Sequence, residues 1–378
     1  MYEPIPGDLM FRCLKDQGMI IMAANFRMTR GVARGVFRAA QDLEAPVIIE
    51  IARSESDLKG GYTGMKPADY ARQIQIAANE VKWDVWALHA DHITVKKGTP
   101  EDIEATKALI DAQIEAGFTS FAIDASHLFN FKGGNLREEM ALNIDATTEL
   151  ARHIKLKMGS KSFGLEVEVG EIGKENESGK VVTTPEEAVT FIKALNENGI
   201  EPDVLAIANG TTHGNIFDDK GNIIDQVGID LDQTGKVAQA LRDMGSHVRI
   251  AQHGITGTPR ETINTRFPKR DILKGNVATH WQNIVLDTVK VYDPEFYREI
   301  WDWTVATYGP KNPGKPDKVV FGKNVKNCFG QFYSRFQNLE FEAVDTIEAF
   351  AYAEARTYFK AFSATGTAAL VRDAMESA

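Results

Sequence analysis

Short apolar segments alternate with longer segments in which apolar residues recur at helical spacing through about the first 280 residues of the chain. The apolar segments are rich in β-branched residues, which is typical of strands buried on both faces. They predict eight strands, at Ile20–Ala24, Pro46–Ile51, Val85–His89, Ser120–Asp124, Ser162–Glu168, Val204–Ala208, Val248–Ala251 and Gly275–Val277. The longer segments predict helices, of which the clearest are at Thr29–Leu43, Pro67–Lys82, Pro100–Gly117, Leu136–Met158, Pro185–Asn198 and Leu231–Met244.

Residue types at the ends of the longer segments support these helices. Thr99 and Thr184 each precede a proline, so each can cap a helix whose first turn tolerates that proline. Gly117 and Gly199 stand at the opposite ends, where glycine commonly terminates a helix. Eight strands alternating with helices can form a doubly wound sheet or a (β/α)8 barrel. The count of eight over about 258 residues favours the α/β barrel.

The chain continues for roughly a hundred residues after the eighth predicted strand. This part contains a loop rich in proline, glycine and lysine, Tyr308–Lys318, and a helical pattern over Thr346–Phe362. We therefore expect two regions, a (β/α)8 barrel (a TIM barrel) at residues 1–280 and a helical C-terminal extension at residues 281–378. The extension is expected to pack on the barrel or on a neighbouring subunit.

Composition and charge narrow the class of protein. Forty-three Lys and Arg residues against fifty-three Asp and Glu residues give a net charge of −10, which argues against bulk nucleic-acid binding. No apolar segment approaches the ~18 residues of a membrane-spanning helix, and the N-terminus lacks the pattern of a secretory signal. Cys13 and Cys328 are too few for a disulfide framework or a cysteine-built zinc site. We therefore expect a cytoplasmic protein without a membrane or nucleic-acid partner.

Histidines gather at the carboxyl ends of the predicted strands. Four of the eight histidines, His89, His92, His213 and His253, fall at or just beyond strands three, six and seven. The carboxyl ends of barrel strands face one mouth, where the active sites of barrel enzymes lie. Any one of these histidines could be a loop residue that only forms hydrogen bonds with the backbone. This alternative accounts less well for all four together. Three imidazoles with neighbouring carboxylates suit a catalytic zinc site, although cobalt, iron and nickel also accept imidazole ligands.

Glycines and one aspartate add to this pattern. Glycines surround strands six, seven and eight, at positions 210, 214, 254, 257 and 275. Such glycines let backbone N–H groups approach a phosphate closely, or they simply turn the chain. Asp91 directly precedes His92, and beside a metal it can act as a base or orient a ligand imidazole.

Six sequence motifs carry a closer resemblance to a known family. The motifs HADH, FAIDASH, GLEVEVGEIG, AIANGTTHGN, AQHGITGTP and GNVAT occur in this order between about Ile20 and Thr279. Together they resemble the class II, metal-dependent ketose-bisphosphate aldolases. The resemblance implies a barrel enzyme that cleaves a ketose bisphosphate reversibly into dihydroxyacetone phosphate and an aldehyde such as glyceraldehyde 3-phosphate. It also implies zinc or another divalent metal, a monovalent cation, and a homodimer or homotetramer.

The resemblance also implies which residues bind metal and substrate. His92, His213 and His253 would bind zinc, and Asp124 and Glu168 would hold or tune the metal region. The residues that would hold the dihydroxyacetone phosphate part are Gly214, Gly254, Thr256, Asn276, Ala278 and Thr279.

Two proton-transfer roles follow from the same resemblance. Asp91 would carry the proton of the C4 hydroxyl group. The family's loop glutamate, which handles the C3 proton, aligns with Asn176, so one of the flanking residues Glu175 and Glu177 would replace it. Zinc would stabilise the enediolate as a Lewis acid. The alternative, a lysine Schiff base, is disfavoured because no predicted strand ends in lysine and Lys274 lies at the start of strand eight.

Two departures from the family pattern bear on the substrate. Ala278 stands where many fructose-bisphosphate members have an aspartate, as in the tagatose-bisphosphate branch. No basic residue aligns cleanly with the distal phosphate, for which Lys323, Lys326 and Arg335 are candidates. Fructose 1,6-bisphosphate is the favoured substrate, followed by tagatose 1,6-bisphosphate or another ketose 1-phosphate. A zinc-dependent C4 epimerase and a non-catalytic barrel that binds sugar phosphates are further hypotheses.

Overall fold

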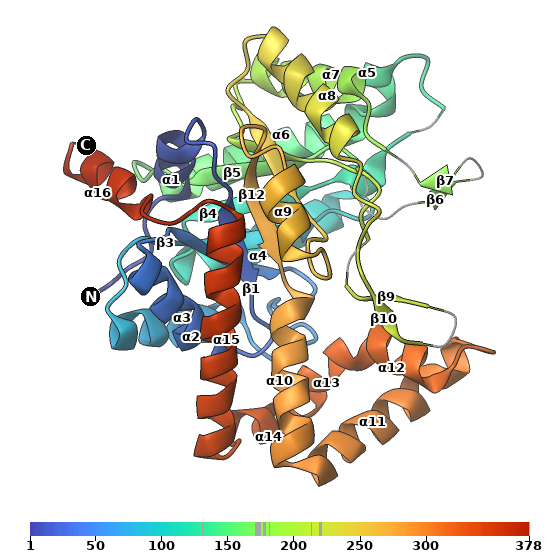
Figure 1. Cartoon of the computed structure of the whole chain (residues 1–378). Helices are drawn as coiled ribbons and strands as arrows, with labels where there is room; N and C mark the ends of the chain where they lie inside the picture. The colour runs from blue at the N-terminus through green and yellow to red at the C-terminus, as the bar shows by residue number, and fades with distance from the viewer. Residues whose placement is uncertain are drawn as a thin grey trace.

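A computed structural model gives the fold of the chain (Figure 1). It describes residues 1–130, 132–170, 182–212, 214–218 and 221–377, together with the backbone alone of residues 175–176 and 179–180. Eight parallel strands close into a barrel in the order β1-β12-β11-β8-β5-β4-β3-β2. The predicted α/β barrel is therefore confirmed.

The barrel strands agree with the predicted ones except at some ends. They are β1 (Ile21–Asn25), β2 (Val47–Ala52), β3 (Trp86–Thr94), β4 (Ser120–Asp124), β5 (Gly164–Glu168), β8 (Val204–Ala206), β11 (Arg249–Gln252) and β12 (Ile272–Val277). Two predictions were too short, because β3 continues past His89 and β12 begins before Gly275. In both cases a polar residue, Asp91 or Lys274, interrupts the apolar pattern, yet its side chain is buried.

Helices surround the barrel strands. Those that follow barrel strands one to seven are α2 (Val32–Leu43), α3 (Pro67–Val81), α4 (Pro100–Glu115), α6 (Ala141–Met158), α7 (Pro185–Glu197), α8 (Leu231–Asp243) and α9 (Arg260–Arg266). The predicted caps are present, since the hydroxyl groups of Thr99 and Thr184 accept hydrogen bonds from the third residue of α4 and α7. Further short elements are α1 (Gly7–Leu14), η1 (Ser126–Leu128) and the hairpins β6 (Glu175–Asn176) with β7 (Gly179–Lys180) and β9 (Ile216–Phe217) with β10 (Ile223–Ile224).

The prediction of a single helix at Leu136–Met158 is wrong. The structure divides it into α5 (Leu136–Glu139) and α6, with the break at Met140. The backbone of Met140 leaves the helical region, at φ −95° and ψ 1°, while its side chain is completely buried. The sequence does not reveal this break, because Met140 is apolar and buried and therefore keeps the helical spacing of apolar residues.

The C-terminal part of the chain is helical. Its elements are α10 (Thr279–Tyr292), α11 (Pro294–Tyr308), η2 (Gly309–Lys311), α12 (Asp317–Asn324), η3 (Val325–Asn327), α13 (Cys328–Gln331), α14 (Tyr333–Gln337), α15 (Phe341–Ala361) and α16 (Ala368–Glu376). Helix α15 runs beside α10 in Figure 1 and packs against α2 and α9 of the barrel, while α16 packs against α1. The division into domains at residues 1–280 and 281–378 stays a prediction.

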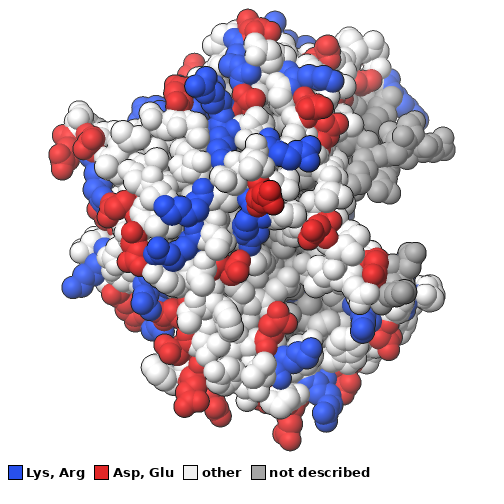
Figure 2. All heavy atoms as spheres, viewed as in Figure 1, with Lys and Arg blue, Asp and Glu red and all other residues white. Residues whose placement is uncertain are grey.

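The surface carries mixed charge. On the face shown in Figure 2, Lys and Arg side chains are interspersed with Asp and Glu side chains. This face therefore presents no uniform field of one sign. Among the described residues, every helix is too short or too polar to cross a membrane.

Candidate active site

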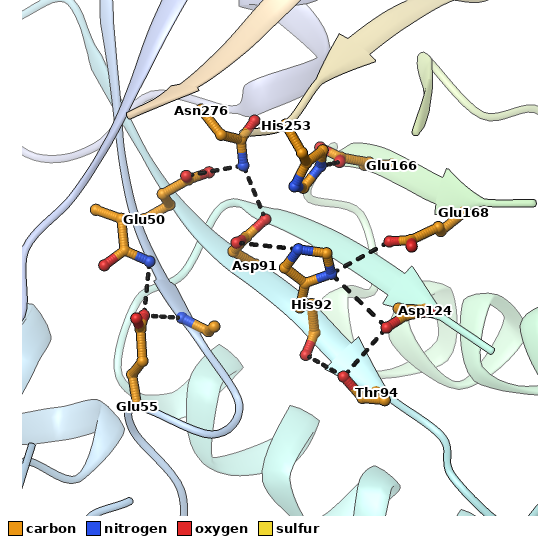
Figure 3. Close-up of polar contacts among 12 residues, drawn as sticks. Glu50, Glu55, Asp91, His92, Thr94, Asp124, Glu166, Glu168, His253 and Asn276 are labelled. Carbon is orange, nitrogen blue, oxygen red and sulfur yellow. Dashed lines mark hydrogen bonds and ion pairs between the residues drawn. The ribbon is translucent and has the colours of Figure 1, made fainter. Parts of the chain in front are cut away.

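A β-bulge in β3 turns two consecutive residues toward the mouth of the barrel. The pairing of β3 with β4 shifts register between Ala90 and Ile93, and His92 has a positive φ of 40°. Successive residues of a regular strand point to opposite faces, so the extra residue of a bulge re-aims a side chain. Asp91 and His92 consequently point into the same cluster (Figure 3).

Five side chains, from three strands and from the residue that follows a fourth, meet at this point. We call Asp91, His92, Asp124, Glu168 and His253 the mouth cluster. His92 Nδ1 lies 3.2 Å from Glu168 Oε2 and 3.7 Å from Asp124 Oδ2, and His92 Nε2 lies 4.0 Å from Asp91 Oδ2. The ring centroids of His92 and His253 are 4.5 Å apart. Figure 3 shows the five side chains converging from the ends of β3, β4 and β5 and from the residue after β11.

The charges of the mouth cluster favour a bound cation. Burial, reinforced by the negative charge of Asp124, raises the pKa of Glu168 to about 8. Burial also opposes the ionisation of Asp91, but the neighbouring His92 and Lys274 outweigh it and lower the pKa to about 2. Burial and the adjacent His92 lower the pKa of His253, which therefore favours the neutral imidazole that a metal requires.

The donor set fits a divalent metal such as zinc. The potential ligand atoms of Asp91, His92 and His253 lie within 4.8 Å of one another, as do those of His92, Asp124 and Glu168. Imidazole nitrogens and carboxylate oxygens are the ligands of catalytic zinc sites. His213, the third predicted zinc ligand, lies outside the described residues.

The residues predicted to hold the phosphate line the same cavity as the mouth cluster. This cavity has a volume of about 320 Å³, and its lining includes Gly214, Gly254, Thr256, Asn276, Ala278 and Thr279. Gly254 has φ +67°, and a Cβ there would lie 2.8 Å from the Thr212 carbonyl oxygen, so a side chain cannot be accommodated. Thr279 is the first residue of α10, where the helix offers N–H groups to an anion.

The predicted catalytic glutamates are described only in part. Glu175 lies in the hairpin strand β6, where the structure describes its backbone alone, and Glu177 lies outside the described residues. Their catalytic roles stay predictions. Of the three candidates for the distal phosphate, Lys326 lines the cavity and Lys323 lines a neighbouring one. Arg335 instead makes ion pairs with Asp293 and Glu299.

The prediction that His89 joins the mouth histidines is wrong. His89 lies inside β3 rather than at its end, and it is completely buried. Its Nδ1 lies 2.7 Å from Ser120 Oγ, and its Nε2 lies 3.2 Å from Lys274 Nζ. Strand β3 continues past His89 to Thr94, and its bulge turns Asp91 and His92 rather than His89 toward the mouth cluster.

Because β12 begins at Ile272, the prediction that Lys274 lies at the start of strand eight is also wrong. Its side chain is fully buried inside the barrel, and its Nζ lies 2.7 Å from Glu166 Oε2 and 2.9 Å from Glu50 Oε2. Although burial favours the neutral amine, Glu166 and Glu50 raise the pKa of Lys274 above its usual value. An amine that stays protonated is a poor Schiff-base nucleophile, so the lysine-dependent mechanism is disfavoured for this reason instead.

Sequence reasoning missed part of the cavity wall. We call Arg27, Glu55, Tyr62 and Lys326 the rim group, because all four line this cavity outside the mouth cluster; of the four, Lys326 alone was a predicted candidate. Arg27 Nη1 donates to Thr279 Oγ1 at 3.1 Å, and Arg27 Nε lies 3.1 Å from Glu55 Oε1. Tyr62 OH donates to the same Glu55 oxygen at 2.6 Å. Arg27 lies shortly after β1 and Glu55 shortly after β2. Their positions after strand ends could therefore have marked them as candidates for the site.

Comparisons with known proteins agree with this arrangement. A family model described as Fructose-bisphosphate aldolase class-II matches residues 8–335. The fructose-bisphosphate aldolase of Streptococcus pneumoniae serotype 4 is 30% identical over 251 residues, which cover 66% of this chain and 70% of that protein. A segment of 89 residues, 22% of this chain and 21% of its relative, is 36% identical to the D-tagatose-1,6-bisphosphate aldolase subunit GatZ of Salmonella gallinarum. The solved fructose-bisphosphate aldolase of Campylobacter jejuni shares the fold, with a TM-score of 0.58 at 18% identity over 97% of each chain.

Proposed function

We propose, from the premise that the chain belongs to the class II fructose-bisphosphate aldolase family, that it is a zinc-dependent aldolase acting on fructose 1,6-bisphosphate. The family is one of metal-dependent aldehyde-lyases of carbohydrate metabolism, and the proposed products are dihydroxyacetone phosphate and glyceraldehyde 3-phosphate. The observation that carries the proposal is the shared cavity, which is lined both by the mouth cluster and by the residues predicted to hold the phosphate.

His92 and His253 are the proposed zinc ligands among the described residues, with His213 as the third. Asp124 and Glu168 lie within ion-pair distance of His92 and would hold this ligand in place. A bound divalent metal supplies Lewis-acid stabilisation of the negative charge that develops when the substrate is cleaved.

Asp91 is the proposed base for the C4 hydroxyl group. Asn276 Nδ2 donates to Asp91 Oδ1 at 3.2 Å, which fixes the carboxylate, and the low pKa keeps it ionised. When Asp91 takes the hydroxyl proton, the C4 oxygen forms the aldehyde carbonyl, the C3–C4 bond breaks, and its electron pair stays on the dihydroxyacetone phosphate part. Glu175 or Glu177 would then deliver a proton to C3.

Backbone N–H groups at Gly214 and Gly254, and the hydroxyl groups of Thr256 and Thr279, are proposed to hold the phosphate of the dihydroxyacetone part. Arg27 supports this site, because its guanidinium already contacts the Thr279 hydroxyl. We propose Lys326 as the residue nearest to the second anionic group, because it lines the same cavity. A monovalent cation, a cytoplasmic location and a homodimer or homotetramer complete the proposal.

Tagatose 1,6-bisphosphate is the second candidate substrate. Two observations favour it: Ala278 lines the cavity where many fructose-bisphosphate members carry an aspartate, and a short segment matches a tagatose-bisphosphate aldolase subunit. Alanine lacks a side chain that could contact the substrate, so this position is proposed to influence which sugar is accepted.

A triose-release assay tests the proposal. The purified protein is incubated with fructose 1,6-bisphosphate or tagatose 1,6-bisphosphate, with and without a chelator, and zinc is then added back. Turnover that the chelator abolishes and zinc restores is the expected result. If a zinc-loaded protein releases no triose but forms the C4 epimer, the chain is an epimerase. Tight binding of the sugar phosphate without any turnover would make it a non-catalytic binder.

A further inference from the structure

Lys274 is completely buried beneath the mouth cluster, in a second group of charged side chains. Its Nζ lies 2.7 Å from Glu166 Oε2, 2.9 Å from Glu50 Oε2 and 3.5 Å from Asp91 Oδ1. His89 Nε2 lies 3.2 Å from the same ammonium group. We call Glu50, His89, Asp91 and Glu166 the lower cluster. None of its side chains is more than 5% exposed.

The lower cluster is costly for the stability of the barrel. Removing charged groups from water costs several kcal/mol per ion, and replacing buried ion pairs with apolar residues often stabilises a protein. The interior of a (β/α)8 barrel is ordinarily filled by branched aliphatic side chains. Packing alone therefore gives no reason for one lysine and three carboxylates at this depth.

The lower cluster has the geometry of a metal site. The potential ligand atoms of Glu50, His89 and Asp91 lie within 4.8 Å of one another. The ammonium group of Lys274 lies within hydrogen-bond distance of Glu50 and His89, so it stands where a metal ion would bind. The other ring nitrogen of His89, Nδ1, lies 2.7 Å from Ser120 Oγ, so both ring nitrogens have a polar neighbour.

Lys274 is also connected to the mouth cluster. Asp91 belongs to both clusters and contacts Lys274 directly. Glu166 lies between Lys274 and His253, with its Oε1 3.0 Å from His253 Nε2 and its Oε2 on the ammonium group. Lys274 therefore contacts the proposed base and the carboxylate that orients a proposed metal ligand, while it does not line the cavity where substrate would bind.

We propose that Lys274 is a positioning residue whose ammonium group takes the place of a second metal ion, restricting the barrel to one metal and orienting Asp91 and the Glu166–His253 pair. This inference rests on the proposed metal site of the mouth cluster. The number of bound metals is measured without substrate, so its outcome is independent of whether the chain is an aldolase.

The first experiment counts zinc by native mass spectrometry after the full-length protein is loaded with excess zinc and desalted. One zinc per chain is expected in the parent and two in Lys274→Ala, because this variant opens a space surrounded by three carboxylates and His89. In Lys274→Leu the leucine side chain fills the space and offers no metal ligand, so this variant is expected to bind one zinc per chain. A folded Lys274→Ala variant that binds one zinc would overturn the proposal.

Two further measurements keep the test decisive. If Lys274→Ala does not fold, the parent is crystallised in excess zinc and anomalous scattering locates the metal. A zinc peak at the mouth cluster alone supports the proposal, whereas a peak among Glu50, His89 and Asp91 overturns it. For the positioning role, Lys274→Leu should lower kcat about 10–100-fold, the usual loss when a residue behind a metal ligand is replaced, with little change in KM. An unchanged kcat in this variant would refute the positioning role.

Discussion

The mouth cluster and the rim group line one cavity, and these two sides are built in different ways. The mouth cluster comes from short side chains at the ends of strands or directly after them, so the barrel backbone and one β-bulge suffice to bring them together. The rim group instead depends on long side chains that reach one another, as in the hydrogen bond between Arg27 and Thr279, which are 252 positions apart in the chain. Backbone topology therefore fixes one side, and side-chain contacts fix the other.

The two sides also differ in charge. In the mouth cluster three carboxylates face two histidines, which suits a bound cation. In the rim group Arg27 and Lys326 face the single carboxylate of Glu55, which suits an anion. One cavity thus offers a cation site beside an anion site, and this combination agrees with the proposed divalent metal and phosphorylated sugar. Variants on each side should consequently affect different steps.

The largest effect is expected from Asp91→Ala. Removing the proposed base should lower kcat by about 10²–10⁴-fold, the usual contribution of a general acid–base group. The zinc content should stay close to that of the parent, because His92, His253 and the remaining carboxylates are intact. Steady-state kinetics and metal analysis check both parts, with Asp145→Ala on the exposed side of α6 as the control. A kcat within a few-fold of the parent would remove Asp91 from the reaction.

Arg27→Ala should act mainly on binding. The guanidinium group is only 10% exposed and contacts Thr279, Gln282 and Glu55, so its loss removes charged hydrogen bonds worth about 1.5–3 kcal/mol each. We expect KM to rise about 10–100-fold while kcat changes less. Arg335→Ala is the matched control, because this candidate for the distal phosphate is occupied by surface ion pairs. Equal changes in the two variants would contradict the assignment.

The same contrast explains how much the sequence could predict. The places of His92, Asp124, Glu168 and His253 near the mouth could be predicted because each lies at or just beyond the end of an apolar segment, whereas their metal-binding roles came from the family resemblance. Lys274 was misplaced because strand periodicity does not show that a lysine can point inward when carboxylates from distant strands surround it.

The rim group shows the same limit. The partners of Arg27 come from the loop after β2 and from α10, and no local pattern connects these segments. The bulge at Asp91 was equally hidden, because it is a property of the pairing between β3 and β4 rather than of β3 alone. The sequence thus predicts which residues follow strands, but not which long side chains meet.

Tyr62→Phe should give a smaller effect on the rim side. Its hydroxyl group donates to Glu55 at 2.6 Å and accepts from Arg27 Nε at 2.9 Å. It therefore helps to position Arg27 and Glu55, and the variant keeps both of their charges. A loss of about 1 kcal/mol corresponds to an increase in KM of about fivefold. Tyr352→Phe, which loses a hydrogen bond to Asp42 on the surface, is the control and should keep the parent KM. A KM for Tyr62→Phe equal to that of the control would show that Arg27 is held without the hydroxyl group.

Asp203→Asn lies at the opposite end of the barrel and should leave catalysis unchanged. Asp203 directly precedes β8, its Oδ2 accepts a hydrogen bond from the Leu165 N–H at 2.9 Å, and burial raises its pKa to about 7. The folded state therefore binds this proton more tightly than the unfolded state, where the pKa is near 3.8. The free energy of unfolding accordingly falls as the pH rises from about 4 to 7, by up to ~4 kcal/mol.

Asparagine keeps an oxygen that accepts the Leu165 N–H but carries no charge at any of these pH values. The variant and the parent should therefore unfold at similar temperatures near pH 4, and the variant should unfold at a higher temperature near pH 8. Thermal unfolding followed by circular dichroism from pH 4 to pH 8 measures this difference, and parallel assays at pH 8 should give the parent kcat and KM. A difference in unfolding temperature between variant and parent that stays constant with pH would show that the charge of Asp203 does not affect stability. A parent-like kcat in this variant, beside the losses in Asp91→Ala and Arg27→Ala, would locate the chemistry at the carboxyl ends of the strands.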